Sequence, residues 1–326
     1  MRNRPPRAHP QRSALATTAV VALAVTATLV VPRPAAAAES SPVGFGAGTT
    51  GGGSATAVTV STLDAFKSAV TGSTSKVVKV NGLIPLSGQV DIGSNTTVLG
   101  VGSASGFTGG GLRLKKVTNV VVRNLNISKP VAPADGITVQ ASTKVWLDHN
   151  AFSSDLDHGK DYYDGLLDIN HGSDYVTVSW NTFKNHYKGS LVGHSDNNAS
   201  EDTGHLRVTY HHNWFDKVNS RIPSLRFGTG HFYDNYVVGA STAVHSRMGA
   251  QMLVQNNVFR DTAVAVTTNR DSDVDGYANL TGNDLGGAAT EVSQVGTFTS
   301  PPYGYTAEPA STVVASVTAG AGTGKL

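Results

Sequence analysis

Residues Val208–Phe227 read VTYHHNWFDKVNSRIPSLRF, and this stretch carries the pattern from which the fold can be inferred. It begins with strand-forming residues, reaches Asn213 and places an aromatic residue, Phe215, two positions later. A loop segment with Arg221 and Arg226 follows. We interpret the stretch as a β-strand, a turn at an asparagine and a basic loop suited to chemistry.

The asparagine at this turn recurs along the chain, together with a mostly apolar residue two positions later. Successive repeats are separated by 26, 31, 32, 22 and 22 residues, and helical periodicity is almost absent between residues 76 and 285. A base period of 22 with longer middle repeats predicts a parallel β-helix, with stacked asparagines and stacked interior residues. The repeats are aligned on Asn124, Asn150, Asn181, Asn213, Asn235 and Asn257.

A β-propeller and a β-sandwich are the alternative folds for so many short strands. A propeller repeat is nearer about 40 residues or more, and a sandwich does not hold asparagines in register. We therefore expect an all-β chain with one parallel β-helix domain over residues 39–326. Residues 58–70 are predicted to form a short helix, capped at Ser61, that covers the N-terminal end of the stack. Val313, Val314 and Val317 are expected to form a turn packed against the stack.

The first 38 residues have the pattern of a secretory signal. Four arginines precede an apolar run at residues 13–31, and small residues follow at 35–38. A membrane anchor is the alternative, but the run is rich in alanine and threonine and ends beside prolines. Residues 1–38 hold five of the 25 basic residues and none of the 23 acids, so removing them changes the net charge from +2 to −3.

The predicted mature chain is therefore an extracellular protein without a general basic excess. This charge gives no reason to expect a nucleic-acid partner, and we expect neither membrane association nor an oligomer. The sequence contains no cysteine, so the secreted fold must be held by its core without disulfides.

Three aspartates form a candidate metal site. Asp164 and Asp168 are four residues apart in YDGLLDIN, and Asp135 opens the segment DGITV one repeat earlier. Residues i and i+4 of a strand point to the same side, and a matching position on the neighbouring coil lies about 5 Å away. Carboxylates without histidine or cysteine are ligands that suit calcium. A solvated acidic turn is the alternative interpretation.

Three basic residues follow on the next coils, namely Lys188, Arg221 and Arg226. Carboxylates followed by bases along a stack would form a groove that suits an anionic polymer, although ordinary surface bases would give the same pattern. The many histidines are interpreted as turn and stacking residues, because the sequence has no HxxxH or HExxH motif. His194, Ser195 and Asp196 are contiguous and no GxSxG is present, which argues against a catalytic triad.

Three long motifs resemble the pectate lyases of polysaccharide lyase family 1. They are VWLDHNAFS at 145–153, DGLLDINHGSDYVTVSWNTFKNHYKGSLVGHSD at 164–196 and VTYHHNWFDKVNSRIPSLRFG at 208–228. The resemblance implies a secreted, right-handed parallel β-helix. It also implies calcium-dependent cleavage of α-1,4-polygalacturonate by β-elimination, which yields 4,5-unsaturated oligogalacturonides.

The resemblance also implies a role for each candidate residue. The calcium ligands fall on Asp135, Asp164 and Asp168. The catalytic base falls on Arg221, the arginine of an NxRxP segment, and the groups that bind substrate carboxylates fall on Lys188 and Arg226. A free guanidinium is protonated at neutral pH, so the resemblance implies an alkaline optimum.

One departure from the family affects the metal site. Some members have an Asp-Gly-Asp turn where this chain has Pro133-Ala134-Asp135, so only the second acid is kept. We therefore expect calcium to bind weakly alone and to be completed by carboxylates of the substrate.

Three other functions remain open from the sequence. A pectin lyase acting on methyl-esterified polymer would look similar but would lack the carboxylate set. A polygalacturonase would need paired catalytic carboxylates and no calcium. A non-catalytic carbohydrate-binding β-helix would keep the asparagine register but would not need Arg221.

Overall fold

The structure is a computed structural model that describes residues 1–5, 8 and 39–326. The predicted signal segment lies almost entirely outside the described residues. The chain divides into a unit of residues 1–34 and a unit of residues 35–326, and the fold belongs to the second. Among the described residues, no helix combines the length and the apolar character needed to cross a bilayer.

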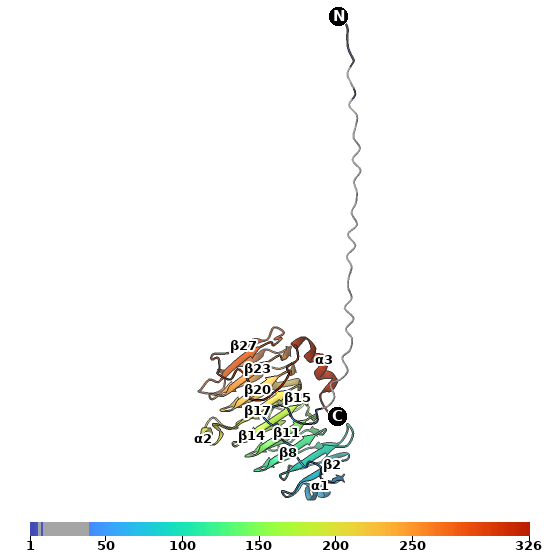
Figure 1. The fold of residues 1–326 in the computed structure, drawn as a ribbon, viewed down its shortest axis with the longest axis vertical. Coiled ribbons are helices and arrows are strands. Elements are labelled where there is room, and N and C mark those ends of the chain that lie inside the picture. The colour runs from blue at the N-terminus through green and yellow to red at the C-terminus, as the bar shows by residue number, and fades with distance from the viewer. Residues whose placement is uncertain (6–7, 9–38) are drawn as a thin grey trace. The chain divides into compact units, whose positions relative to one another are not determined.

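Residues 57–291 form a parallel β-helix in which each coil adds one strand to each of three sheets, called here sheets A, B and C. Each strand pairs in parallel with the strand one coil away, as between β11, β14 and β17. Figure 1 shows these strands as successive rungs from β2 to β23. The right-handed parallel β-helix expected from the sequence is thus confirmed.

The bounds of the elements follow, for the residues that the structure describes. Sheet A contains β1 (Ala57–Val60), β2 (Lys76–Val80), β5 (Thr96–Gly100), β8 (Thr118–Arg123), β11 (Thr143–Asp148), β14 (Asp174–Ser179), β17 (Arg207–His211), β20 (Thr229–Tyr233), β23 (Gln251–Gln255) and β26 (Tyr277–Thr281). Sheet B contains β3 (Leu83–Pro85), β6 (Gly106–Thr108), β9 (Asn126–Ser128), β12 (Ala151–Ser153), β15 (Thr182–Lys188), β18 (Trp214–Ser220), β21 (Tyr236–Val238) and β24 (Val258–Arg260). Sheet C contains β4 (Gln89–Asp91), β7 (Gly111–Lys115), β10 (Ile137–Gln140), β13 (Leu167–Asn170), β16 (Ser190–Val192), β19 (Ser224–Arg226), β22 (Thr242–Arg247), β25 (Val264–Thr267) and β27 (Ala289–Glu291). The helices are α1 (Leu63–Val70), α2 (Ala199–Asp202) and α3 (Ala310–Gly320).

Helix α1 lies at the N-terminal end of the stack, as predicted, but it is shorter than expected. Its N-cap is Thr62, whose hydroxyl accepts a hydrogen bond from the backbone of Ala65 at 3.4 Å. The predicted cap at Ser61 and the predicted start at Val58 are wrong, because Val58 pairs with β2 as part of strand β1. Phe66 is fully buried against Phe107, with ring centroids 4.7 Å apart, which closes the end of the core.

Stacked asparagines form a buried ladder along the turn between sheets A and B. In each step the side-chain amide nitrogen donates to the side-chain oxygen of the next asparagine at 2.9–3.0 Å, and that oxygen also accepts from the backbone. The predicted stacking is therefore confirmed, and it continues one coil further than expected. The ladder contains Asn150, Asn181, Asn213, Asn235, Asn257 and Asn283.

The predicted alignment of the first repeat is wrong by one residue. Arg123 pairs with Asp148, which places Leu125 beside Asn150 and leaves Asn124 outside the ladder. The amide of Asn124 instead donates to the carbonyl oxygens of two glycines at 2.7 and 2.9 Å. The polar Asn126 in the aligned motif had already marked this repeat as irregular.

The interior residues stack as predicted. Phe152, Phe183 and Phe215 are fully buried, and successive rings are nearly parallel with centroids 4.8 and 4.6 Å apart. Helix α3 places Val313 and Val317 in a second buried cluster with Val258, which confirms the expected packing against the stack, although the segment is a helix of 11 residues and not a single turn.

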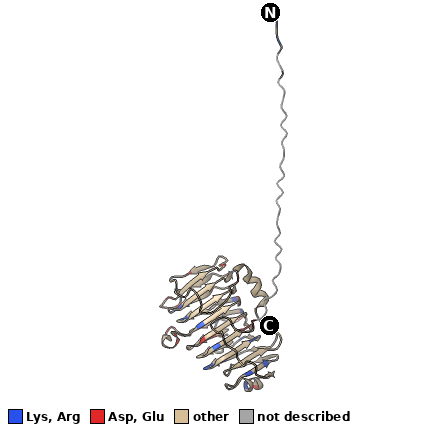
Figure 2. Cartoon of the chain, viewed as in Figure 1, with Lys and Arg blue, Asp and Glu red and all other residues tan. Residues whose placement is uncertain are grey.

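The extra residues of the longer repeats flank sheet C. Residues 129–136 and 154–166 connect sheet B to sheet C, and residues 193–206 connect sheet C to sheet A. Sheet A is instead covered by the N-terminal segment, where Phe45 and Gly46 donate backbone hydrogen bonds to threonine hydroxyls at 3.0 Å. Basic and acidic residues are interspersed over the strands in Figure 2. A site for a polymer is therefore best sought along sheet C.

Candidate active site

Asp135, Asp164 and Asp168 lie on two adjacent coils at one edge of sheet C. Asp168 is on β13, where it pairs in register with Thr138 of β10. The expectation that Asp164 and Asp168 share one strand face is wrong, because Asp164 precedes the strand. The expected matching position is also different, since the register places Asp135 beside Gly165.

Gly165 brings the three carboxylates together. Its backbone N–H donates to Oδ1 of Asp135 at 3.0 Å and to Oδ1 of Asp164 at 3.1 Å. A Cβ atom at this position would lie 2.5 Å from Oδ1 of Asp168 and 3.0 Å from Oδ1 of Asp135. A side chain at residue 165 would therefore fill the space that the carboxylates face, which only glycine leaves open.

Burial and nearby negative charge disfavour the ionised forms of Asp135 and Asp168. Burial raises the pKa of Asp135 to about 6, and the nearby charge of Asp164 adds to the shift. Burial and Asp135 together raise the pKa of Asp168 well above its ordinary value. Buried acids that repel in this way are stabilised by a cation between them.

The carboxylates have the chemistry of a hard-cation site, but their geometry is not preassembled. Among the described residues, no three acidic, histidine or cysteine side chains already surround one point closely enough to hold a metal ion. Nζ of Lys188 lies 3.2 Å from Oδ1 of Asp164, and the hydroxyl of Thr138 donates to Oδ2 of Asp135 at 2.6 Å. The oxygen donors around Gly165 are of the kind that suits calcium.

Lys188 and Arg221 extend the site onto the next two coils. Lys188 ends β15 and pairs in register with Ser220, the residue before Arg221. The backbone N–H of Ser190 donates to the carbonyl oxygen of Arg221 at 2.6 Å. The side chain of Lys188 also contacts Asp161 at 3.3 Å and is only 14% exposed. The structure therefore brings both predicted bases beside the acids.

Arg221 occupies an unusual position in its loop. Its φ angle of 59° lies in the left-handed region, which is uncommon for a residue with a side chain. Within the part of the chain that the structure describes, its guanidinium makes no side-chain hydrogen bond or ion pair. Its positive charge opposes the burial-driven rise in the pKa of Asp168. Arg221 is thus available to a substrate.

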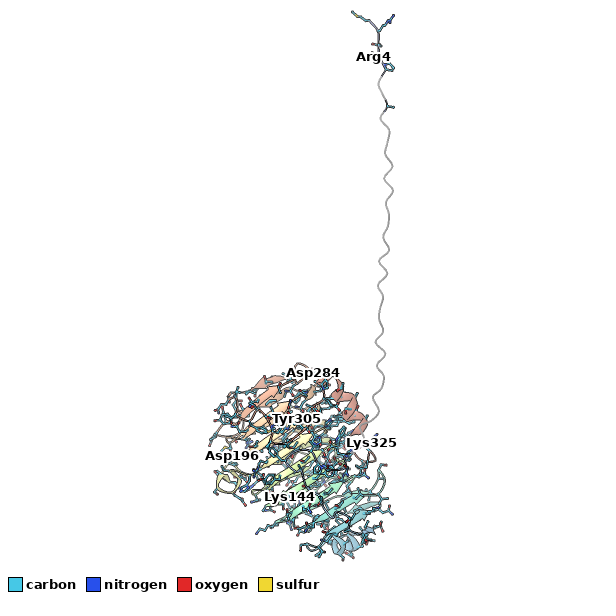
Figure 3. All side chains as sticks on the ribbon, viewed as in Figure 1. Arg4, Lys144, Asp196, Asp284, Tyr305 and Lys325 are labelled. Carbon is cyan, nitrogen blue, oxygen red and sulfur yellow. The ribbon has the colours of Figure 1, made fainter. Side chains whose placement is uncertain are left out.

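Arg226 is more constrained than predicted. It is only 8% exposed, its Nε donates to the carboxylate of Asp196, and its Nη1 donates to the carbonyl oxygen of Gly193 at 2.7 Å. Nη2 of Arg247, one coil further on, contacts the same carboxylate at 3.1 Å. Figure 3 places Asp196 at the margin of the stack beside α2. Sequence reasoning missed this acid, because it was weighed only as part of a contiguous His-Ser-Asp run.

His186 is a further site residue that sequence reasoning missed. Its Nε2 donates to the backbone carbonyl of Asp164 at 2.7 Å, and its Nδ1 lies 2.6 Å from the hydroxyl of Ser154. Burial lowers the pKa of His186 to about 4, so the ring is neutral at neutral pH. The signal was its position two residues before Lys188, which puts both on one face of a strand. His186 fixes the loop that carries Asp164.

Comparisons with known proteins identify the family. A family model described as pectate lyase matches residues 13–326. The chain belongs to the pectate lyase family. It is 48% identical over 277 residues to pectate lyase A of Aspergillus niger, covering 84% of each chain, and 49% identical over 295 residues to pectate lyase B of Colletotrichum gloeosporioides, covering 90% of this chain and 88% of that one. Membership of the pectate lyase family makes the chain a polysaccharide lyase.

Solved pectate lyases have the same fold. The crystal structure of a pectate lyase from Bacillus sp. N165 in complex with trigalacturonate superposes with a TM-score of 0.80 at 32% identity, covering 87% of this chain and 99% of that one. Pectate lyase II from Xanthomonas campestris superposes with a TM-score of 0.74 at 30% identity, covering 87% and 98%.

Proposed function

We propose that this pectate lyase belongs to polysaccharide lyase family 1 and cleaves de-esterified α-1,4-polygalacturonate by calcium-dependent β-elimination. The observation that carries the proposal is a row of groups on four consecutive coils: the three aspartates around Gly165 lie on the first two coils, Lys188 on the third and Arg221 on the fourth. An anionic polymer laid along sheet C would meet a cation site first and two bases next. The product would be a 4,5-unsaturated oligogalacturonide.

The carboxylates Asp135, Asp164 and Asp168 would hold calcium, and bound calcium would neutralise the C6 carboxylate of the reacting sugar and so acidify its C5 proton. Lys188 leaves Asp164 and binds the same C6 carboxylate, where it stabilises the negative charge that develops. This movement of Lys188 would free Oδ1 of Asp164, which the lysine now contacts, to bind the metal. Metal and substrate therefore assemble the site together.

Arg221 removes the proton from C5 of the reacting sugar. The C5–H electron pair forms the C4=C5 double bond while the bond from C4 to the glycosidic oxygen breaks, and the leaving oxygen takes a proton from solvent. Arg226, held by Asp196, binds the carboxylate of a neighbouring sugar. No water is added across the glycosidic bond, which distinguishes this reaction from hydrolysis.

We further propose that residues 1–38 are a signal peptide and that residues 39–326 act outside the cell as a monomer. The arginine-led apolar segment and its small residues support export, and the absence of cysteine in the sequence is compatible with it. Mass spectrometry of the secreted protein would test this, because retention of residues 1–38 would contradict it.

The ultraviolet absorbance of the unsaturated product tests the proposed reaction. We expect absorbance to grow on de-esterified polygalacturonate, to stop when a chelator is added and to return when calcium is restored. Growth only on fully methylated polymer would indicate a pectin lyase. Sugar release without absorbance would indicate a hydrolase.

A further inference from the structure

A cavity of about 690 Å³ opens beside the carboxylates, toward the N-terminal end of sheet C. Arg221 lies in the other direction along the same sheet. The lining of the cavity includes Gln89 of β4, Arg113 of β7 and the segment 131–134 that leads into Asp135. Arg113 pairs with Thr138, which in turn pairs with Asp168. Two strand spacings, about 10 Å, therefore separate the Arg113 and Asp168 positions.

Hydrogen bonds connect this cavity to the candidate active site. The side-chain amide of Gln89 donates to the hydroxyl of Thr138 at 2.5 Å and lies 3.4 Å from the carbonyl oxygen of Asp135. The same hydroxyl donates to the carboxylate of Asp135. The cavity thus adjoins the candidate active site, and a polymer that extends along sheet C past the carboxylates would reach it.

Among the described residues that line the cavity, the one basic side chain is already paired with an acid. It is Arg113, whose Nε and Nη2 donate to the two carboxylate oxygens of Asp91 at 2.6 and 2.9 Å. These hydrogen bonds lower the pKa of Asp91, so the acid stays ionised and balances the guanidinium. The site around Lys188 and Arg221 differs, because the guanidinium of Arg221 makes no side-chain hydrogen bond or ion pair among the described residues.

The remaining wall of the cavity is apolar. Val131, Ala132 and Pro133 are exposed along one side, and Leu86 is buried beneath them. A free uronate here would lose hydration without gaining a counter-charge, and it would approach the carboxylates of Asp91 and Asp135. A methyl ester has no charge, and its methyl group would bury apolar surface against this wall.

We propose that the cavity is a subsite for a methyl-esterified galacturonate unit, near the de-esterified unit that reacts over the carboxylates. This inference rests on the proposed function and adds a substrate class to it: partly methylated pectin, with free acids at the reacting position and an ester at this one. The enzyme would therefore tolerate, and position, one ester within the bound segment.

The test is a ratio of two specificities, namely kcat/KM on fully de-esterified polymer divided by kcat/KM on partly methylated polymer. Asp91→Asn leaves the charge of Arg113 unbalanced, so this ratio should rise about threefold. Val131→Glu adds a carboxylate to the exposed wall, so the ratio should fall. Glu291→Gln is the matched control, because Glu291 makes a similar bidentate pair with Arg270 at the other end of sheet C.

The two variants are expected to move the ratio in opposite directions while Glu291→Gln leaves it unchanged. Melting temperatures equal to the wild type would show that both variants fold. An unchanged or lower ratio for Asp91→Asn, or a higher ratio for Val131→Glu, would overturn the subsite. A wild type that forms no unsaturated product from either polymer would instead contradict the proposed function itself.

Discussion

Lys188 and Asp164 form an ion pair in which Nζ lies 3.2 Å from Oδ1, so the lysine occupies one of the oxygens proposed to hold calcium. The lysine and the metal compete for this carboxylate until a substrate carboxylate draws the lysine away. The pair therefore gives a structural reason for the weak calcium binding expected from the sequence.

Calcium binding without substrate should be weak and should strengthen when this competition is removed. We expect Lys188→Gln to bind calcium about tenfold more tightly than the wild type, because a positive charge beside Asp164 is lost. The same variant should lose activity on polygalacturonate. Calorimetric titration measures the affinity, with Lys129→Gln as the control because Lys129 pairs with Asp155 instead. Tight binding by the wild type alone would refute this explanation.

Because the buried acids repel one another, replacing one of them should stabilise the protein while it removes a proposed calcium ligand. We expect Asp168→Asn to raise the melting temperature in chelator by about 2–4 °C, because it removes a buried charge beside Asp135. Added calcium should stabilise the wild type but have little effect on this variant. Scanning calorimetry with and without calcium checks both points. Asp284→Asn, at an exposed ion pair, is the control, and a lower melting temperature for Asp168→Asn would argue against repulsion.

Asp234 should make stability depend on pH independently of the metal site. Burial raises the pKa of Asp234 to about 8 from its usual value of 3.8. A raised pKa means that the group contributes stability below pH 3.8 that is lost as the pH rises through about 8. The melting temperature of Asp234→Asn minus that of the wild type should therefore grow between about pH 5 and about pH 9. The exposed Asp273→Asn should show no such trend, and a constant difference for Asp234→Asn would be evidence against the buried charge.

An alanine substitution in the asparagine ladder should destabilise the protein most when it is made in the middle of the ladder. Asn181→Ala removes the acceptor for two N–H groups of Asn150 and the donor to the carbonyl oxygen of Leu147, all of them buried. We expect the free energy of unfolding to fall by more than about 3 kcal/mol. Asn283→Ala removes similar hydrogen bonds at the partly exposed end of the ladder, where water can replace them. It should therefore lower the free energy of unfolding by less. Urea unfolding would show whether the two costs differ in this order.

The sequence predicted the stacked fold because its asparagines recur at one turn, and a buried amide tolerates only that arrangement. It predicted that these acids and bases lie close together because they fall on consecutive coils, whereas their roles stay predictions. The register error at Asn124 arose because Leu125 occupies the ladder position of this coil and has an asparagine on either side. The role of Gly165 and the ion pair between Asp196 and Arg226 depend on the paths of the long loops, and residue spacing does not determine those paths.

The central claim is that Arg221 removes the C5 proton, and the rate of unsaturated-product formation by Arg221→Ala tests it most directly. The measurement uses polygalacturonate with saturating calcium at alkaline pH, and Arg260→Ala at an exposed ion pair is the control. We expect kcat to fall by about 10²–10⁴-fold while calcium still binds in the presence of an oligogalacturonate. A variant that keeps kcat within about tenfold of the wild type, when a general base contributes at least about 10², would contradict it.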